Sequence, residues 1–352
     1  MDSAPRTLLA GRDLLRWGMI GCGDVTERKS GPAFNLAPNS RLVAVACRTP
    51  GRAAEYARRH GVPCAYETVD ALLADPDVDA VYLATPPGSH LDLARRVAAT
   101  GRPCYVEKPM ARNAAEARAM VAAFEAAGLP LYVAHYRRAW PRFLWVREAV
   151  QGGEIGTLTS IEVTFTQPMQ ADDPAALPWR LRAEESGGGL FVDLAPHALD
   201  VIDAVAGPIT HASGTAVRGA ATYRVEQAVS LAFEAGDAVG SGRWNFGSAV
   251  REDRLAFTGT LGRVSTPVFD AGPVVLETPR GTFRLPFQTP APVQLPLVAQ
   301  VTQALRGRGT CDATGAAGLR SMEVIDAALS GYYGGREDGF WDRPETWPGA
   351  QP

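Results

Sequence analysis

Residues 15–25 read LRWGMIGCGDV, a short apolar run followed at once by two glycines one residue apart. The run Leu15–Ile20 is typical of a buried strand, and Gly21 and Gly23 predict a tight turn into a helix. At such a turn, backbone N–H groups can face the pyrophosphate of a dinucleotide. The next small position holds Thr26 in place of Gly or Ala, so the turn alone does not separate a nucleotide site from an ordinary β-α turn.

The same rhythm continues to about residue 135, where apolar runs alternate with Ala-rich segments. The further expected strands are Leu42–Ala46, Ala80–Ala84, Cys104–Glu107 and Leu131–Ala134. The expected helices between them are Arg52–His60, Leu91–Ala99 and Ala114–Ala127. This alternation is typical of a parallel sheet covered on both faces, and it predicts a doubly wound Rossmann domain over residues 1–135.

After Gly152 the pattern changes to alternating polar and apolar residues. The expected strands here are Thr159–Thr166, Ala228–Phe233, Ala238–Phe246 and Arg254–Thr258, with helices over Leu190–Ala206 and Ala316–Leu329. Such runs, joined by Gly-containing turns, favour an open and mostly antiparallel sheet. We therefore expect an α/β protein with a second domain over residues 136–352.

Composition narrows the class of function. The chain has 352 residues and a net charge of -3, without a basic run that would bind nucleic acid or a membrane surface. Its five cysteines are odd in number and scattered, which favours a reducing compartment and gives no metal-ligand spacing. The start, Met1–Arg12, lacks a signal-peptide core, so we expect a cytoplasmic protein that acts on small molecules.

The end of the second strand indicates which dinucleotide is preferred. An acidic residue there would accept the ribose hydroxyls of NAD, whereas Arg pairs with the extra phosphate of NADP. The sequence has Cys47-Arg48-Thr49 at this place, with Arg52 close behind and without a carboxylate. This favours NADP(H) over NAD(H), although an ordinary solvated arginine is the alternative.

Lysine is scarce in this chain, and its placement is informative. Of the 35 basic residues only Lys29 and Lys108 are lysines. A lysine amine can be tuned towards the working pH and act as a general acid, which a guanidinium cannot. Lys108 follows a predicted strand, at the sheet edge where open α/β folds bind ligands. Glu107 beside it could hold the amine, and a structural ion pair is the alternative interpretation.

A second group of polar residues lies on an apolar helix. Ser186 and three glycines lead into this helix, on which Asp193 and His197 are four residues apart and share a face that Asp200 continues. Pro196 would strain a regular helix, so the segment is expected to bend or restart there. The glycines permit close approach of backbone to a ligand. Taken singly, His197 could be a core histidine and Asp193 a capping residue.

Together these motifs resemble the glucose-fructose oxidoreductase/inositol dehydrogenase family, often called Gfo/Idh/MocA. The motifs that carry the resemblance, in family order, are Gly21-Cys22-Gly23, Thr85-Pro86-Pro87 with His90, Glu107-Lys108-Pro109, Trp179-Arg180 and the Asp193/His197 segment. Pro87 stands where Asn is frequent in that family, and Cys47 where Ser often precedes the Arg that reads NADP. Because of these two departures, the family pattern defines the ribose and nicotinamide contacts of this chain less completely than its other contacts.

The resemblance implies a Rossmann domain followed by an α/β domain whose open sheet forms a homodimer or homotetramer interface. It implies Lys108, Asp193 and His197 as catalytic residues and Tyr136 and Arg137 as substrate contacts. The cofactor contacts that follow from the motifs and the strand ends are Gly21, Gly23, Asp24, Val25, Arg48, Thr49, Thr85, Pro86, His90, Glu107, Lys108, Trp179 and Arg180.

The expected activity is hydride transfer between NADP(H) and a hydroxyl or carbonyl carbon of a sugar, ketosugar or cyclic polyol. His197 is expected to move the proton, with Lys108 polarising the oxygen, and the reverse assignment stays open. Three alternatives remain: a trans-dihydrodiol dehydrogenase, a glycoside hydrolase that uses NAD for transient oxidation, and a cofactor-binding regulator without chemistry.

Overall fold

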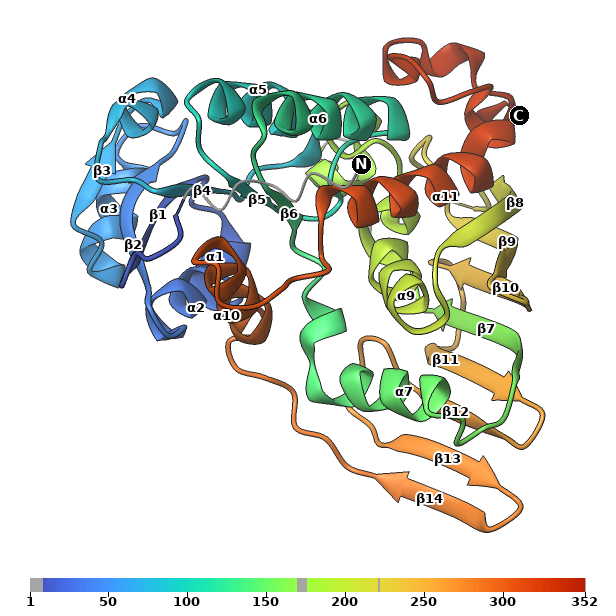
Figure 1. Cartoon of the computed structure of the whole chain (residues 1–352). Helices are drawn as coiled ribbons and strands as arrows, with labels where there is room; N and C mark the ends of the chain where they lie inside the picture. The colour runs from blue at the N-terminus through green and yellow to red at the C-terminus, as the bar shows by residue number, and fades with distance from the viewer. Residues whose placement is uncertain (1–8, 170–175, 221, 352) are drawn as a thin grey trace. The chain divides into compact units, whose positions relative to one another are not determined.

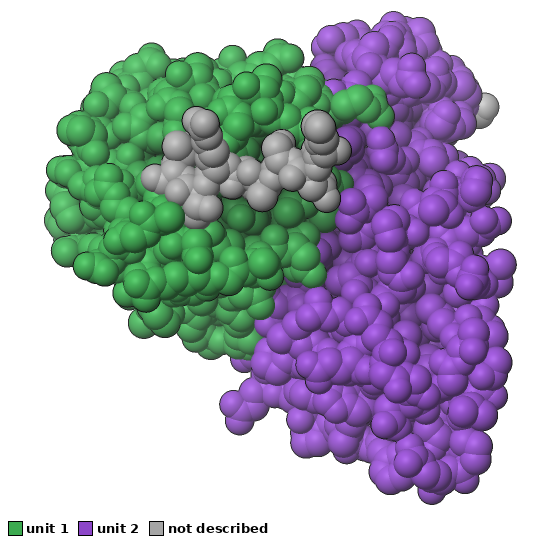
Figure 2. Space-filling model, in the orientation of Figure 1, with its two compact units in different colours: residues 1–110, 116–136, 290–318 green, residues 111–115, 137–289, 319–352 purple. Residues whose placement is uncertain are grey.

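The computed structural model describes residues 9–169, 176–220 and 222–351, so the first eight residues of the segment Met1–Arg12 lie outside it. Contacts divide the chain into two compact units, coloured in Figure 2. Unit 1 comprises residues 1–110, 116–136 and 290–318, and unit 2 comprises residues 111–115, 137–289 and 319–352. Unit 1 thus contains a segment from late in the sequence in addition to the N-terminal residues.

A parallel six-stranded sheet forms the centre of unit 1. Its spatial order is β3-β2-β1-β4-β5-β6, and every neighbouring pair is parallel. The strands are β1 (Leu15–Ile20), β2 (Ser40–Ala46), β3 (Cys64–Tyr66), β4 (Ala80–Leu83), β5 (Cys104–Val106) and β6 (Leu131–Val133). The strand order reverses between β1 and β4, which is the point where folds of this kind bind ligands. The predicted Rossmann topology is confirmed.

Helices cover both faces of this sheet, with α5 and α6 on one side and α2 and α10 on the other (Figure 1). The helices of unit 1 are α1 (Asp24–Arg28), α2 (Gly31–Leu36), α3 (Arg52–His60), α4 (Val69–Ala74), α5 (His90–Ala99), α6 (Ala114–Ala127) and α10 (Leu295–Leu305), with a 3-10 turn η1 (Pro87–Ser89). Helix α10 comes from the late segment and packs against α2. The helical layer on this side of the sheet therefore includes residues far from the Rossmann motifs in sequence.

An aromatic cluster holds α2 against the sheet. The ring of Phe34 lies 5.1 Å from that of Trp17 and 5.0 Å from that of Tyr82, and Tyr82 stacks on Tyr105 at 5.2 Å. All four side chains are buried. Each such ring pair stabilises a fold by roughly 0.5–1.5 kcal/mol beyond the area it buries. The cluster also places two tyrosine hydroxyl groups in the core, where each needs a hydrogen-bond partner.

Unit 2 is built on an eight-stranded sheet of order β14-β13-β12-β11-β7-β10-β9-β8. The strands are β7 (Leu158–Thr166), β8 (Ile209–Val217), β9 (Ala228–Ala235), β10 (Ala238–Asn245), β11 (Glu252–Gly259), β12 (Gly262–Thr266), β13 (Val274–Thr278) and β14 (Gly281–Leu285). Only β7 and β10 pair in parallel, so the expectation of a mostly antiparallel sheet is confirmed. Burial alternates along β9, which shows one buried and one open face.

The buried face of this sheet is packed by helices. Helices α7 and α9 lie side by side along it (Figure 1). The helices of unit 2 are α7 (Pro141–Gln151), α8 (Ala183–Ser186), α9 (Leu190–Ala206) and α11 (Gly315–Tyr333), with the 3-10 turns η2 (Tyr136–Ala139), η3 (Trp179–Leu181), η4 (Phe340–Asp342), η5 (Pro344–Thr346) and η6 (Pro348–Ala350). The bounds of α9 are those predicted from the sequence.

The sequence predicts a bend or a restart at Pro196, and the restart is wrong, because α9 runs without a break through the proline. Proline inside a helix removes one backbone hydrogen bond, and its ring clashes with the carbonyl four residues earlier, which together cost about 3 kcal/mol. Most residues between Phe191 and Ile202 are buried. Each large apolar side chain among them contributes roughly 1.5–3 kcal/mol on burial. Packing therefore keeps the helix continuous.

The three glycines before α9 are needed for contacts within the protein. A Cβ atom on Gly187 would lie 2.2 Å from the carbonyl oxygen of Arg112, and one on Gly189 would lie 2.6 Å from the carbonyl oxygen of Glu226. The Glu226 carboxylate accepts hydrogen bonds from the N–H of Gly189 at 2.9 and 3.0 Å, and from the hydroxyl of Tyr333. The start of α9 is thus bound by a buried acid of the chain itself, which suits the positive end of a helix.

The C-terminal tail completes this anchor. The guanidinium of Arg336, whose side chain is 1% exposed, donates to the carbonyl oxygens of Gly187 and Arg112, both at 2.7 Å. It also pairs with Asp326 on α11 at 2.7 Å. The residues after Gly334 therefore include a buried arginine that fixes the loop before α9.

Helix α1 has its own anchor in unit 1. The carboxylate of Glu27 accepts from both terminal nitrogens of Arg59 on α3, at 2.7 and 2.8 Å, and lies 2.8 Å from Nε2 of His60. These partners, above all Arg59, lower the pKa of Glu27 to about 2. The charged form of Glu27 therefore holds α1 to α3.

We expect Gly187→Ala to destabilise the protein much more than Gly153→Ala. The two glycines have φ of 81° and 83°, so both substitutions carry the same backbone strain of about 1–2 kcal/mol. Only at Gly187 does the added methyl group meet another atom, since a Cβ atom on Gly153 would have nothing within 4 Å. The overlap should add roughly 1–3 kcal/mol, measured as a difference in urea unfolding. Equal losses would contradict the described packing.

We expect Glu27→Gln to lower stability at neutral pH and to lose that effect in acid. An Asp or Glu whose pKa is depressed in the folded state stabilises the protein above its unfolded pKa, about 4.3 for Glu. This contribution disappears as the pH falls from there towards about 2. Urea midpoints of wild type and variant should converge as the pH falls from about 5 to about 2. A constant difference across this range would refute the ion pair.

Candidate active site

The two glycines of the turn after β1 differ in their surroundings: Gly21 is packed closely against the protein, whereas Gly23 has open space beside it. Gly21 has φ of 102°, and a Cβ atom there would lie 2.7 Å from the carbonyl oxygen of Ala84, at the end of β4. A Cβ atom on Gly23 would meet no atom within 4 Å. Gly21 is thus needed for packing at the strand-order reversal, whereas the space beside Gly23 suits the close approach of a pyrophosphate. Asp24 and Val25 begin α1 directly after it.

The departure at Thr26 has a structural explanation. Its side chain is buried, and its hydroxyl donates to the carbonyl oxygen of Gly23 at 2.7 Å. The hydroxyl of Tyr56 on α3 donates to the Thr26 carbonyl at 2.9 Å. The glycine needed for close packing here is Gly31, where a Cβ atom would lie 2.0 Å from the Tyr56 hydroxyl oxygen. Thr26 therefore closes the turn with its side chain.

The end of β2 presents polar groups to solvent. Arg48 and Thr49 are exposed, and Arg52 is exposed at the start of α3. Behind them lies the thiol of Cys22, whose pKa is raised to about 12, chiefly by burial and also by its neighbour Cys47. The predicted NADP-reading group is thus accessible, while the cysteine of the turn is a neutral packing residue.

His90 joins the loops that follow β4 and β5. Its Nε2 lies 2.7 Å from the carbonyl oxygen of Thr85 and its Nδ1 lies 3.2 Å from that of Met110. The ring is fully buried, which lowers its pKa. Pro86 follows Thr85 directly, so His90 holds the backbone at two predicted cofactor contacts and joins it to the loop at Met110.

Glu107 is the centre of a buried hydrogen-bond network. Its Oε1 accepts from the hydroxyl of Tyr82 and from Nε2 of Gln294, both at 2.5 Å. The hydroxyl of Tyr105 donates to Oε1 of the same Gln294 at 3.0 Å. Burial, followed by the charge of Glu107, raises the pKa of both tyrosines. The network satisfies the two hydroxyl groups of the aromatic core and binds α10 to the end of β5.

Lys108 extends from this fixed point. Its backbone N–H donates to Oε2 of Glu107 at 3.2 Å, and its side chain is partly exposed. The other lysine, Lys29, is exposed after α1. Since the preceding residue is buried and hydrogen-bonded in the core, the backbone of Lys108 is held at the carboxyl edge of the parallel sheet. This is the location that the sequence predicts for it.

In unit 2, Asp193 is bound to the predicted Trp179-Arg180 pair. Nε of Arg180 donates to Oδ2 of Asp193 at 2.9 Å, and the guanidinium lies 4.5 Å from the centre of the Trp179 ring. Asp193 is buried, while Arg180 is exposed. These three residues, predicted from two separate motifs, are brought together.

His197 lies one turn further along α9 and contacts an aromatic ring. It is buried, and its ring meets that of Phe269 edge to face, with centroids 5.6 Å apart. On another side, the guanidinium of Arg137 lies 4.5 Å from the centre of the Phe269 ring. Arg137 is therefore grouped with His197 through Phe269. The preceding Tyr136 is buried at the start of η2.

Asp200, which shares the predicted helix face, has a structural partner. Its carboxylate accepts from Nε of Arg138 at 3.0 and 3.1 Å. Asp203, almost one turn later, pairs with Arg320 on α11 at 2.7 Å. The polar residues of α9 therefore form two groups. Asp193 and His197 contact, directly or through Phe269, other predicted site residues. Asp200 and Asp203 form ion pairs that hold the helix in place.

Two residues that contact proposed site residues, Gln294 and Phe269, were not predicted from the sequence. Gln294 lies about 190 residues after Tyr105 and belongs to no motif. Phe269 follows β12 in an irregular segment that carries no periodic pattern. A single apolar residue between Val268 and Asp270 gives no local signal, and only the fold places it beside His197.

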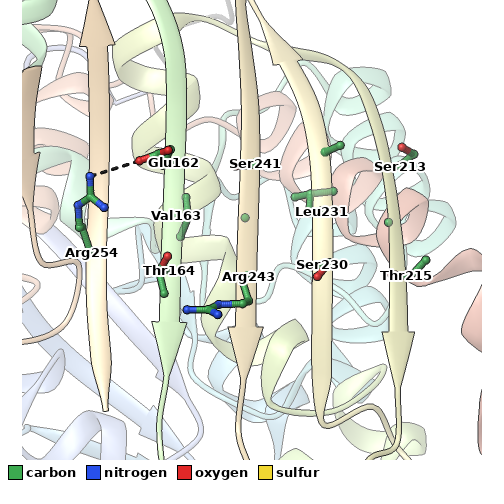
Figure 3. A pocket seen from close by; sticks show the side chains of 13 residues that line it. Glu162, Val163, Thr164, Ser213, Thr215, Ser230, Leu231, Ser241, Arg243 and Arg254 are labelled. Atoms are coloured by element: carbon green, nitrogen blue, oxygen red, sulfur yellow. Dashed lines mark hydrogen bonds and ion pairs between the residues drawn. The ribbon is translucent and has the colours of Figure 1, made fainter. Parts of the chain in front are cut away.

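The open sheet face carries a hollow that is separate from these residues. It has a volume of about 620 Å³ and is lined mostly by short side chains of β7 to β11, with Arg243 and the Arg254–Glu162 pair among them (Figure 3). None of the predicted catalytic or cofactor residues lines it. Its place on the side of the sheet opposite the packed helices fits a contact surface better than a reaction site.

The described ranges hold neither a candidate metal site nor a membrane-spanning helix. Among residues 9–169, 176–220 and 222–351, no group of three His, Cys, Asp or Glu side chains is placed to hold a metal ion. The helices of the same ranges include none that is long and apolar enough to cross a membrane.

Known proteins resemble the chain over most of its length. It is 36% identical over 253 residues to Oxidoreductase P35 of Formosa agariphila, covering 71% of this chain and 78% of that protein. It is 28% identical to 1,5-anhydro-D-fructose reductase of Ensifer adhaerens, covering 90% of this chain and 97% of that enzyme. The solved structure of levoglucosan dehydrogenase with NADH and levoglucosan superposes with a TM-score of 0.80 at 22% identity, covering 90% and 96% of the two chains.

Two family descriptions match successive parts of the sequence. Residues 15–135 match the oxidoreductase family with an NAD-binding Rossmann fold, and residues 143–265 match the GFO/IDH/MocA C-terminal domain. The first match spans the six-stranded sheet and the turn at Gly23, and the second spans α9 with Asp193 and His197. The chain is therefore an oxidoreductase of the GFO/IDH/MocA family, with an NAD(P)-binding Rossmann domain.

Proposed function

We propose that this protein transfers a hydride between NADP(H) and a hydroxyl or carbonyl carbon of a sugar, ketosugar or cyclic polyol. The observation that carries the proposal is Lys108, which is partly exposed at the carboxyl edge of the parallel sheet and follows a residue locked in the core. A primary amine that extends from a held backbone at that edge suits a group that polarises a substrate oxygen. Family membership supports the same class of reaction.

Residues 1–135 are proposed to bind the cofactor and residues 136–352 the substrate. The open space at Gly23, with Asp24 and Val25, would take the pyrophosphate. The exposed groups of Arg48 and Thr49 would take the phosphate on the adenosine ribose, which is the reason for preferring NADP over NAD. The remaining proposed contacts are Thr85, Pro86, His90, Glu107, Lys108, Trp179 and Arg180.

When bound, the nicotinamide supplies or accepts the hydride. The part of the protein is then proton transfer and positioning. His197 takes the hydroxyl proton during oxidation and returns it to the oxygen during reduction, while Lys108 polarises that oxygen. Asp193, held by Arg180, orients the substrate hydroxyl or the imidazole. Tyr136 and Arg137 are the proposed further substrate contacts.

The open face of the eight-stranded sheet is the proposed interface of a homodimer or homotetramer. Helices α7 and α9 occupy the opposite face, whereas this one presents short side chains around the hollow of Figure 3. Exposed Val217 and Val239 extend the apolar surface along β8 and β10. Such a flat surface suits pairing with a second copy of itself.

We expect Lys108→Ala and His197→Ala each to lower turnover, with NADP+ for alcohols and NADPH for carbonyl compounds, by roughly 100-fold or more, the usual scale of general acid–base catalysis. Lys29→Ala is the matched control, because it removes the only other lysine. Turnover is followed as absorbance of NADPH with a panel of sugars, ketosugars, inositols and dihydrodiols. Unchanged turnover in both variants would remove these residues from the reaction.

We expect wild type to prefer NADP over NAD, and Arg48→Asp to reduce or reverse this preference. The variant removes a cation from the ribose phosphate and adds a charge that repels it. Arg58→Asp changes the net charge equally on an exposed residue of α3 and should leave the ratio of kcat/KM values intact. A wild type that prefers NAD would overturn the role of Arg48.

A further inference from the structure

The segment from Pro267 to Asp270 is irregular, yet its backbone is held firmly. The carboxylate of Asp253 on β11 accepts hydrogen bonds from three successive backbone N–H groups, those of Val268, Phe269 and Asp270, at 2.9, 2.7 and 2.7 Å. A carboxylate bound by three N–H groups is a strong, charge-assisted anchor. Asp253 thus fixes the backbone of Phe269, the middle residue of the three.

Two buried arginines bind the carbonyl oxygens of the same segment. Nε of Arg137 and Nη2 of Arg142 donate to the carbonyl of Val268 at 2.8 and 3.1 Å, and Nη1 of Arg142 donates to that of Asp270 at 3.1 Å. Burial, followed by the charge of Arg137, lowers the pKa of Arg142 to about 10, so it is still charged at neutral pH. The cost of burying two cations is offset by these bonds.

The segment held by these hydrogen bonds carries the side chain of Phe269, which is apolar and contacts its neighbours only through its ring. The ring of Phe269 meets His197 at 5.6 Å, Phe165 at 4.6 Å and the guanidinium of Arg137 at 4.5 Å. Val268 beside it is buried in the core, whereas Phe269 stays partly exposed. An aromatic ring kept partly in solvent by a rigid backbone, against a proposed catalytic histidine, is arranged as a binding surface.

We propose that Phe269 is a specificity-determining residue, whose ring packs against the apolar C–H face of a cyclic substrate next to the carbon served by His197. The inference rests on the proposed function and narrows its substrate class to ring compounds such as pyranoses, inositols or cyclic diols, over open-chain polyols.

The physical reason is the shape and charge of the two partners. The face of a phenyl ring is electron-rich and flat. The C–H bonds on one side of a six-membered ring form a matching flat surface, whereas an open chain must lose rotational freedom to present one. Arg137 and Asp253 then act as positioning residues, because they fix the backbone that carries the ring.

The test is a comparison of Phe269→Leu and Phe269→Tyr with wild type on matched substrates: glucose and myo-inositol as cyclic compounds, sorbitol and xylitol as open chains, with NADP+. Leu retains an apolar side chain of similar size without the flat ring, and Tyr retains the ring. We expect Phe269→Leu to raise KM for the cyclic compounds by about fivefold, with kcat nearly unchanged and KM for open chains unaffected. Phe269→Tyr should restore the wild-type ratio.

Phe283→Leu is the matched control, since it removes an exposed phenyl ring on β14 of the same sheet and should change neither KM. Equal changes for cyclic and open-chain compounds, or no change for either, would overturn the inference while leaving the proposed reaction intact. A wild type inactive on every compound of the panel would instead overturn the proposed function, and the inference with it.

Discussion

The position of Lys108 and the attachment of α10 both depend on the burial of one carboxylate, Glu107, at the end of β5. A charge in the core is tolerated only when its lone pairs are used, and here Tyr82 and Gln294 donate to it. Because Gln294 begins α10, the same contact draws the late segment 290–318 onto the parallel sheet. Lys108 comes directly after this fixed residue, in the loop that follows β5, so the core holds the backbone from which its side chain extends.

Buried or partly buried carboxylates also hold the backbone of unit 2. Glu226 accepts the N–H of Gly189 and fixes the start of the helix that carries Asp193 and His197. Asp253 accepts three N–H groups and fixes the segment that carries Phe269. In each case a carboxylate binds irregular backbone that regular secondary structure cannot order. The proposed reactive groups are thereby held without a bound ligand, as pre-organised catalysis requires.

How far the sequence could predict this arrangement differs from residue to residue. Strands β1, β2 and β4 to β6 were found because each is a continuous apolar run, whereas β3 has three residues that are not buried and gave no signal. Asp193 and Arg180 were predicted from separate motifs, and the structure joins them. The glycines before α9 were interpreted as space for a ligand, but that space is filled by Arg112 and Glu226. Gln294, Asp253 and Phe269 act through contacts between distant parts of the chain, and such contacts leave no local pattern to find.

The proposed reaction requires that Lys108 and His197 act on the same substrate oxygen. A crystal structure of the complex with NADP+ and the best substrate of the panel tests this most directly. The account predicts that Nζ of Lys108 and a ring nitrogen of His197 both lie about 2.6–3.2 Å from the oxygen on the carbon facing the nicotinamide. A bound substrate whose reacting oxygen touches neither side chain would contradict it.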